Sequence, residues 1–86
     1  GDGDWMEGIV RFVSLTGETQ NAHDLGSPDE ADPRMRKYKI RRADVFARWL
    51  LSFAGNALPV GPKELVDEFN AQLIATTALY AGVDNG

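Results

Sequence analysis

The densest group of side chains that could bind a ligand is a run of cations near the middle of the chain. Residues 34–42 read RMRKYKIRR. Because side chains alternate along a strand, Lys37, Lys39 and Arg41 share one face, opposite Tyr38. A row of cations suits the phosphate groups of nucleic acids and nucleotides. The predicted nucleic-acid or effector site consists of Arg36, Lys37, Lys39, Arg41 and Arg42.

The same run has a structural explanation. Lysines on an outer strand keep it solvated and protect its edge from aggregation. Binders of single-stranded nucleic acid combine cations with aromatic side chains on one face. Tyr38 is predicted on the wrong face, so Phe12 of a neighbouring strand is the candidate for stacking, with Arg11 as a further cation. The sequence leaves both explanations open.

Catalytic and metal chemistry have weaker support. His23 and Asp24 are adjacent, but no nucleophile or third ligand lies near them, so they are expected to be solvated loop residues. Asp2 and Asp4 are not followed by oxygen ligands at the spacing of a calcium loop. The chain is therefore predicted to have no catalytic residues, no metal and no cofactor, and not to be an enzyme.

Composition limits the partners and the compartment. The chain has 86 residues, of which nine are basic and thirteen acidic, giving a net charge of -4. This charge disfavours nonspecific attraction to phosphate polymers, so any nucleic-acid contact must be local. The absence of cysteine fits a reducing compartment, and we expect a cytoplasmic protein. No apolar run approaches the roughly 20 residues that span a bilayer, so no membrane partner is expected.

Apolar periodicity predicts the elements that position these residues. A strand is expected over residues 5–15, with Ile9 and Val13 on one face, Val10 and Phe12 on the other, and cover on both sides over part of its length. The second strand is the cationic run. A brief edge strand containing a proline is expected over residues 56–60.

Two helices complete the prediction. The first covers residues 43–55, where Trp49 and Phe53 belong to a broad apolar stripe and are candidates for a protein interface. The second begins near Pro62 and ends near residues 81–82. Its predicted buried face contains Leu65, Phe69, Leu73, Thr76 and Tyr80.

The fold class that follows is α+β, with an antiparallel sheet of about three strands and two helices on one face. Residues 6–82 are expected to form a single domain. Residues 16–33 contain mostly turn-forming types and are predicted to be a mobile loop. Residues 1–5 are expected to be a flexible terminus or an expression remnant, and residues 83–86 a polar tail.

The second half of the chain resembles the C-terminal extension that follows the WYL domain in bacterial helix-turn-helix transcription regulators. The resemblance rests on RWLL at residues 48–51 followed by FAG, on PKEL at residues 62–65, and on Leu79 with Tyr80. It implies a ferredoxin-like fold and a role in dimerisation or in sensing a nucleic-acid or nucleotide effector. The implied partners are the WYL and helix-turn-helix domains of the same regulator and a second copy of the chain.

Overall fold

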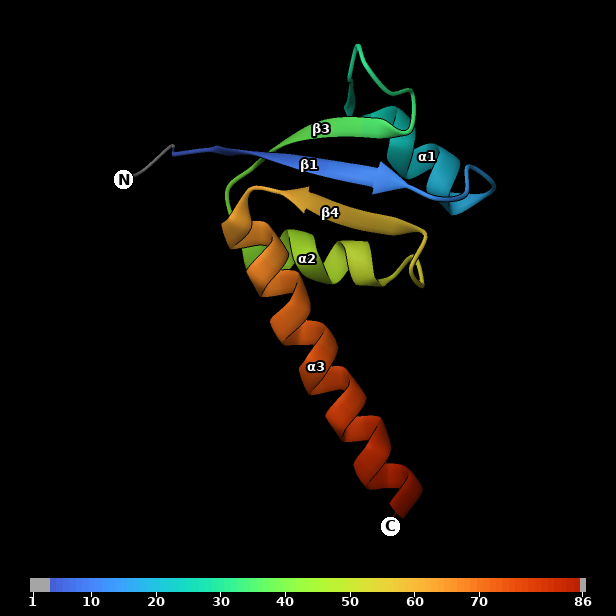
Figure 1. Ribbon diagram of the computed structural model, residues 1–86, viewed down its shortest axis with the longest axis vertical. Helices are drawn as coiled ribbons and strands as arrows, with labels where there is room; N and C mark the ends of the chain where they lie inside the picture. Colours follow the sequence, from blue (N-terminus) through green and yellow to red (C-terminus); the bar gives the residue numbers. More distant parts are fainter. Residues whose placement is uncertain (1–3, 86) are drawn as a thin grey trace.

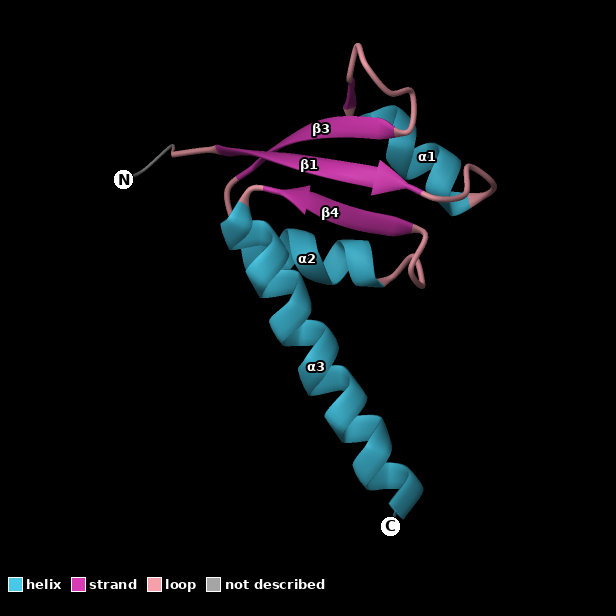
Figure 2. Ribbon diagram, viewed as in Figure 1, coloured by secondary structure: helices cyan, strands magenta, loops and turns pink. Residues whose placement is uncertain are grey.

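The structure, a computed structural model, describes residues 4–85 and the side chains of residues 4–82. Four strands form one antiparallel sheet in the order β2-β3-β1-β4 (Figures 1 and 2). The elements in chain order are β1 (Met6–Phe12), α1 (Glu18–Leu25), β2 (Ser27–Pro28), β3 (Met35–Ile40), α2 (Ala43–Leu51), β4 (Ala57–Gly61) and α3 (Lys63–Asn85). The predicted α+β class is confirmed, although the sheet has four strands rather than three and the described chain has three helices rather than two.

The helices cover one face of the sheet, and the strands bury alternate residues against them. Val10 and Phe12 of β1 are fully buried, whereas Ile9 on the opposite face is only half-buried. Val13 lies beyond the end of β1 and is 51% exposed. The expected cover on both sides of this strand is therefore wrong, because no helix packs on its second face among the described residues.

The core lies between the sheet and the pair α2 and α3. Leu50 of α2 and Leu65 of α3 are fully buried with Phe12. The centre of this layer leaves little room above β1, because a Cβ added at Gly8 would lie 3.2 Å from Ile40 Cδ1 and 3.3 Å from Leu65 Cδ2. Leu65 at the base of α3 therefore packs closely over Gly8.

The expected mobile loop over residues 16–33 is wrong for most of its length, because it contains α1 and β2. The α1 helix buries only Thr19 and Ala22, so it has no apolar stripe for a sequence pattern to reveal. It is held instead by polar contacts, among them the hydroxyl of Tyr38, which donates to the carbonyl oxygen of Ala22. The two residues of β2 pair with β3.

The last helix is longer and more exposed than predicted. It continues through residues 83–85, which were expected to belong to a tail, while Gly86 and residues 1–3 lie outside the described residues. We call the sheet together with α1 and α2 the body. Side chains of α3 contact the body as far as Gln72, whose Nε2 donates to the carbonyl oxygen of Asp44 over 2.7 Å. Beyond that point α3 projects away from the sheet (Figure 1) and contributes to a longest dimension of 47 Å.

The first half of α3 is buried on one face, and the second half is exposed. Leu65 and Phe69 are buried as predicted, with 0% and 7% of their surface exposed. Leu73 is 44% exposed, Tyr80 is 69% exposed, and Thr76 is also exposed. The predicted buried face is thus correct for the first half of the helix and wrong for the second, because the body ends near Gln72.

Candidate nucleic-acid interface

The uncovered face of the sheet carries side chains from its two central strands. The antiparallel register places Lys39 opposite Glu7, Lys37 opposite Ile9, and Met35 opposite Arg11. All six residues alternate with the buried positions, so they lie on the face that the helices leave open. We call this surface the open face. Its residues are Glu7, Ile9 and Arg11 of β1, Met35, Lys37 and Lys39 of β3, and the adjoining Trp5 and Arg41.

Two of the predicted cations, Lys37 and Lys39, lie on the open face as expected. A shallow hollow of about 90 Å³ lies beside them, lined by Glu7, Ser27, Lys37, Tyr38 and Lys39. Neither lysine forms an ion pair within residues 4–85. Their charge is therefore available to an anionic ligand.

Arg41 follows the last residue of β3 and contacts the ring of Trp5, the first residue of the strand expected over residues 5–15. Its Cζ atom lies 4.3 Å from the centroid of the Trp5 ring, which is a cation–π distance. Trp5 is 55% exposed. The arginine thus holds a large ring at one end of the open face, where part of that ring remains accessible to a ligand.

The other two predicted cations are elsewhere. Arg36 points to the covered face, where its Nε donates to His23 O at 2.8 Å and its Nη2 to Gly26 O at 2.6 Å. These carbonyl groups lie at the C-terminal end of α1, so Arg36 stabilises that end of the helix. Arg42 precedes α2 and donates to both carboxylate oxygens of Asp44. Arg36 therefore lies apart from the lysines on the covered face, and Arg42, whose side chain is 70% exposed, forms an ion pair with Asp44. Their part in a binding site stays a prediction.

Phe12, which was predicted to stack on a base, does not lie on the open face. Phe12 is fully buried on the covered face, and its ring centroid lies 5.5 Å from that of His23. Trp5 takes its place as the aromatic residue beside the cations. The signal was present in the sequence, because Trp5 extends the alternation of Glu7, Ile9 and Arg11 by one step.

His23 and Asp24 lie in α1 rather than in a loop, and of the two only Asp24, whose side chain is 61% exposed, is solvated as expected. The side chain of His23 is 12% exposed, with Nδ1 at 3.0 Å from Asp24 Oδ1 and Nε2 at 2.9 Å from Pro33 O. The hydrogen bond to His23 lowers the pKa of the Asp24 carboxyl, with a further contribution from the amide of Gln20. The contact of His23 Nε2 with Pro33 O therefore holds the segment before β3 against α1, while Nδ1 contacts Asp24 within the helix.

The proposed interface aromatics belong to a ring cluster in the helix layer. Trp49 lies 5.3 Å from Phe46, 5.8 Å from Tyr38 and 5.2 Å from Phe53, measured between ring centroids. Burial raises the pKa of Tyr38 in this cluster to about 12. Phe53 is only 8% exposed, so it offers little area to a partner, while Trp49 is half-buried.

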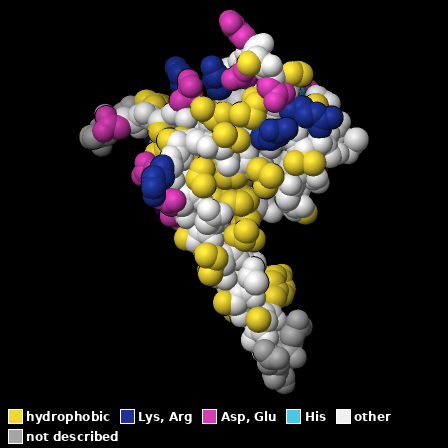
Figure 3. All heavy atoms as spheres, viewed as in Figure 1, with side chains coloured by type: hydrophobic (Ala, Val, Ile, Leu, Met, Phe, Trp, Pro, Cys, Tyr) yellow, Lys and Arg dark blue, Asp and Glu magenta, His cyan; other side chains and the backbone are white. Residues whose placement is uncertain are grey.

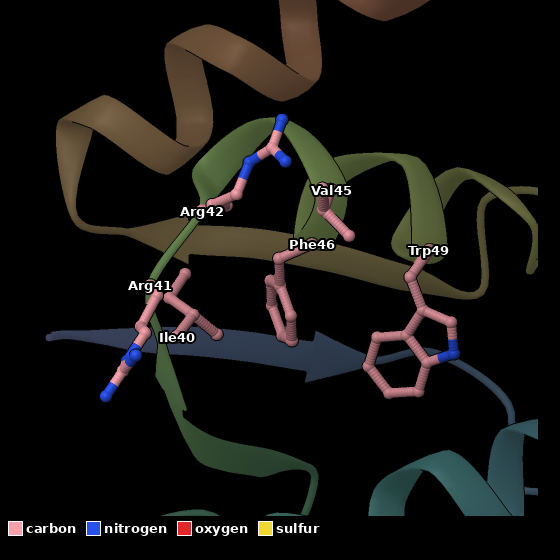
Figure 4. A pocket seen from close by; sticks show the side chains of 6 residues that line it. All are labelled: Ile40, Arg41, Arg42, Val45, Phe46 and Trp49. Atoms are coloured by element: carbon pink, nitrogen blue, oxygen red, sulfur yellow. The ribbon is translucent and has the colours of Figure 1, made fainter. Parts of the chain in front are cut away.

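A larger hollow of about 460 Å³ borders this cluster (Figure 4), lined by Ile40, Arg41, Arg42, Val45, Phe46 and Trp49. Figure 4 shows the two arginine side chains pointing away from the rings of Phe46 and Trp49. Small-molecule sites combine an apolar wall with polar groups that converge on the ligand. This hollow has the apolar wall without that convergence.

Two further kinds of site were sought in the described residues. Within residues 4–85, no group of three His, Cys, Asp or Glu side chains could hold a metal ion. No helix in the same part of the chain is long and apolar enough to cross a membrane. Comparison with family models, curated proteins and solved structures gives no match to this chain.

Proposed function

We propose that this chain is a non-enzymatic sensing module that binds single-stranded nucleic acid or a nucleotide on its open face. The observation that carries the proposal is the contact between Arg41 and the exposed ring of Trp5, beside Lys37 and Lys39 on the two central strands. Stacking on an aromatic ring and charge contacts to phosphate are the two parts of sequence-independent recognition of single strands.

Each part of the ligand has a counterpart on this face. A base would stack on Trp5, whose ring is 55% exposed, while Arg41 holds the ring from its other side. Phosphates would contact Lys37 and Lys39, with Arg11 at the far end of β1. Four-stranded sheets of RNA-binding domains present bases to aromatic residues on their open face in the same manner.

The charge distribution accounts for binding by an acidic chain. The open face carries four cations, Arg11, Lys37, Lys39 and Arg41, against the carboxylate of Glu7. Most acidic residues belong to the segment from α1 to β3 and to the first turns of the helices. Figure 3 shows Lys and Arg side chains beside Asp and Glu side chains over the sheet region, whereas the projecting part of α3 shows apolar and uncharged surface. Binding is therefore expected to be modest and strongly salt-dependent.

We further propose that the module is the C-terminal accessory part of a WYL-type helix-turn-helix regulator and that its fold is ferredoxin-like. The β-α-β-β-α-β order, followed by α3, and the sheet order β2-β3-β1-β4 support this fold. The RWLL, PKEL and Leu79–Tyr80 sequence features support the family. Binding of an effector would then be passed to the WYL and helix-turn-helix domains of the same cytoplasmic regulator. The alternative is a free-standing domain that binds single strands by itself.

A titration with a short oligothymidylate, followed by anisotropy of a dye on the oligonucleotide, tests the binding proposal. With three or four phosphate contacts, affinity should fall roughly 20- to 50-fold between 50 and 200 mM salt. Lys37→Glu combined with Lys39→Glu should abolish binding. The matched control is Arg48→Glu combined with Lys63→Glu, which changes the net charge equally but lies on the helices. Equal losses in both double variants, or binding independent of salt, would refute the open face as the site.

A further inference from the structure

The open face carries a carboxylate among its cations. Glu7 lies on β1 directly opposite Lys39 of β3, and Trp5 precedes it by one step along the same face. A surface that binds only phosphate gains nothing from a carboxylate, because like charges repel. Glu7 therefore has no role in the phosphate contacts proposed for the lysines.

An ion pair with Lys39 would give Glu7 a purely structural role. Opposite residues of an antiparallel pair have Cβ atoms about 4.5–5.5 Å apart, so the two side chains are close enough to meet. Within residues 4–85, however, Glu7 forms no ion pair and accepts no hydrogen bond. Glu7 is also exposed. Its carboxylate is therefore available to accept hydrogen bonds from a ligand.

Glu7 forms one wall of the shallow hollow of about 90 Å³ on this face. The polar side chains around the hollow are those of Glu7, Ser27, Lys37 and Lys39. They come from three neighbouring strands, since Ser27 of β2 pairs with Lys37 and Glu7 of β1 pairs with Lys39. A carboxylate only accepts hydrogen bonds, an ammonium group only donates them, and a hydroxyl does both. The hollow thus offers an acceptor from β1 and donors from β3.

Guanine is the base whose edges match this set of groups. Its N1–H and its N2 amine are neighbouring donors, and a carboxylate can accept from both. Its O6 and N7 atoms are acceptors, for which lysine is a usual partner in base recognition. Thymine and uracil place a carbonyl oxygen on each side of their one N–H, which repels a carboxylate. Cytosine and adenine offer one amine beside an acceptor nitrogen.

We infer that the hollow beside Glu7 selects guanine, so that the open face takes a guanine nucleotide or a single strand that contains guanine. This inference rests on the proposed function and names the base that the site prefers. Glu7 accepts from N1 and N2 of the guanine, and Lys37 or Lys39 donates to O6. Residues two apart in an extended chain are separated by about 7 Å, so Glu7 contacts a base next to the one stacked on Trp5.

Four pentanucleotides that differ in the central base test the inference on the whole chain. Each has thymidylates around one guanine, adenine, cytosine or thymine, and anisotropy of a terminal dye reports binding. The guanine strand should bind roughly 5- to 20-fold more tightly than the thymine strand, which is the lower part of the range for a bidentate base contact because the hollow is shallow. Hypoxanthine in place of guanine lacks the N2 amine and should lose most of this preference.

Glu7→Gln removes the charge and one of the two acceptor oxygens. It should bring the guanine and thymine strands to within roughly twofold of each other. The thymine strand should bind equally or more tightly, because the face loses a negative charge. The matched control is Glu18→Gln, which removes the same charge from an exposed position in α1 and should keep the preference. Retention of the preference in Glu7→Gln, or equal loss in both variants, would overturn the inference.

The outcomes separate this inference from the proposed function. Equal binding of the four strands by the unsubstituted chain would overturn the choice of guanine and leave the open face as a site for single strands. Binding of none of them would overturn both.

Competition by mononucleotides distinguishes the two sources of the base. Guanosine monophosphate should displace the guanine strand at lower concentration than thymidine monophosphate does, and equal displacement by the two would contradict the guanine hollow. Because a mononucleotide supplies no second base to Trp5, it should bind more weakly than the strand. Equal affinity of guanosine monophosphate and the strand would identify the free nucleotide as the ligand.

Discussion

Substitution of Gly26 by alanine tests the packing of α1 on β3, which is the part of the fold that the sequence did not predict. The backbone at Gly26 is extended, with φ -87° and ψ 171°, so alanine introduces no backbone strain. A Cβ built there, however, lies 2.7 Å from Tyr38 Cζ and 2.9 Å from Arg36 Cβ. Since carbon atoms pack at about 3.5–4.0 Å, the ring of Tyr38 and the strand must move apart from α1.

The cost has two sources. Overpacking of a well-filled site costs about 1–3 kcal/mol. Movement of the ring also weakens the hydrogen bond from the Tyr38 hydroxyl to Ala22 O, a contact whose net contribution is about 1 kcal/mol. The expected loss of unfolding free energy is therefore about 2 kcal/mol. In a domain of this size it corresponds to a fall in Tm of about 8–16 °C.

Thermal unfolding followed by circular dichroism measures this loss. Gly82→Ala is the control, because nothing lies within 4 Å of its added Cβ and the position is helical. Removing a helical glycine should leave Tm unchanged or raise it slightly. A Tm for Gly26→Ala within 2 °C of the unsubstituted chain would refute the placement of α1 against Tyr38 and Arg36.

Three further outcomes follow from the core, the phenol and the open face. Phe12→Ala should cost about 3–5 kcal/mol in urea unfolding, since this fully buried ring lies between the sheet and the helices; a loss below 1 kcal/mol would contradict that burial. Because the pKa of Tyr38 is raised from 10.0 to about 12, its stabilising contribution is complete below pH 10 and is lost as pH rises toward 12. The urea midpoint should therefore fall more steeply over this range than in Tyr38→Phe, and parallel curves would refute the shift. Trp5→Ala should weaken oligothymidylate binding by roughly 5- to 150-fold, the value of one stacked base, while Tm stays within 2 °C; unchanged affinity would remove Trp5 from the site.

Elements with a strong apolar period could be predicted, and elements held by polar contacts could not. The strand after residue 34 and the helix from residue 43 have regular alternation or helical spacing, and both form, although the helix ends at Leu51 rather than at residue 55. By contrast, α1 reads ETQNAHDL and buries only Thr19 and Ala22. Its stability comes from Arg36, Tyr38 and His23, contacts that join residues 10 to 16 positions apart. No local pattern encodes such contacts.

The candidate site was predicted in part for a similar reason. Alternation correctly placed Lys37 and Lys39 on one face, because period two is a property of the strand itself. It could not show that Arg36 meets the end of α1 or that Arg41 meets Trp5, since both depend on which elements are neighbours. The face of α3 that was predicted to be buried follows a helical period, but the exposure of its second half depends on where the rest of the domain ends.

Because α3 is one continuous helix, a movement at its base is transmitted to its far end. One end of this 23-residue helix rests on β1, where Leu65 closely approaches Gly8, and the other end stands clear of the body. Gly8 lies between Glu7 and Ile9 of the open face, so a shift of β1 in that region would tilt the helix at its base. A tilt of about 10° over a helix of about 35 Å would displace the far end by roughly 6 Å. This sideways displacement is comparable to the distance of about 8–10 Å between the axes of packed helices, which is enough to separate the far end of α3 from a helix packed against it.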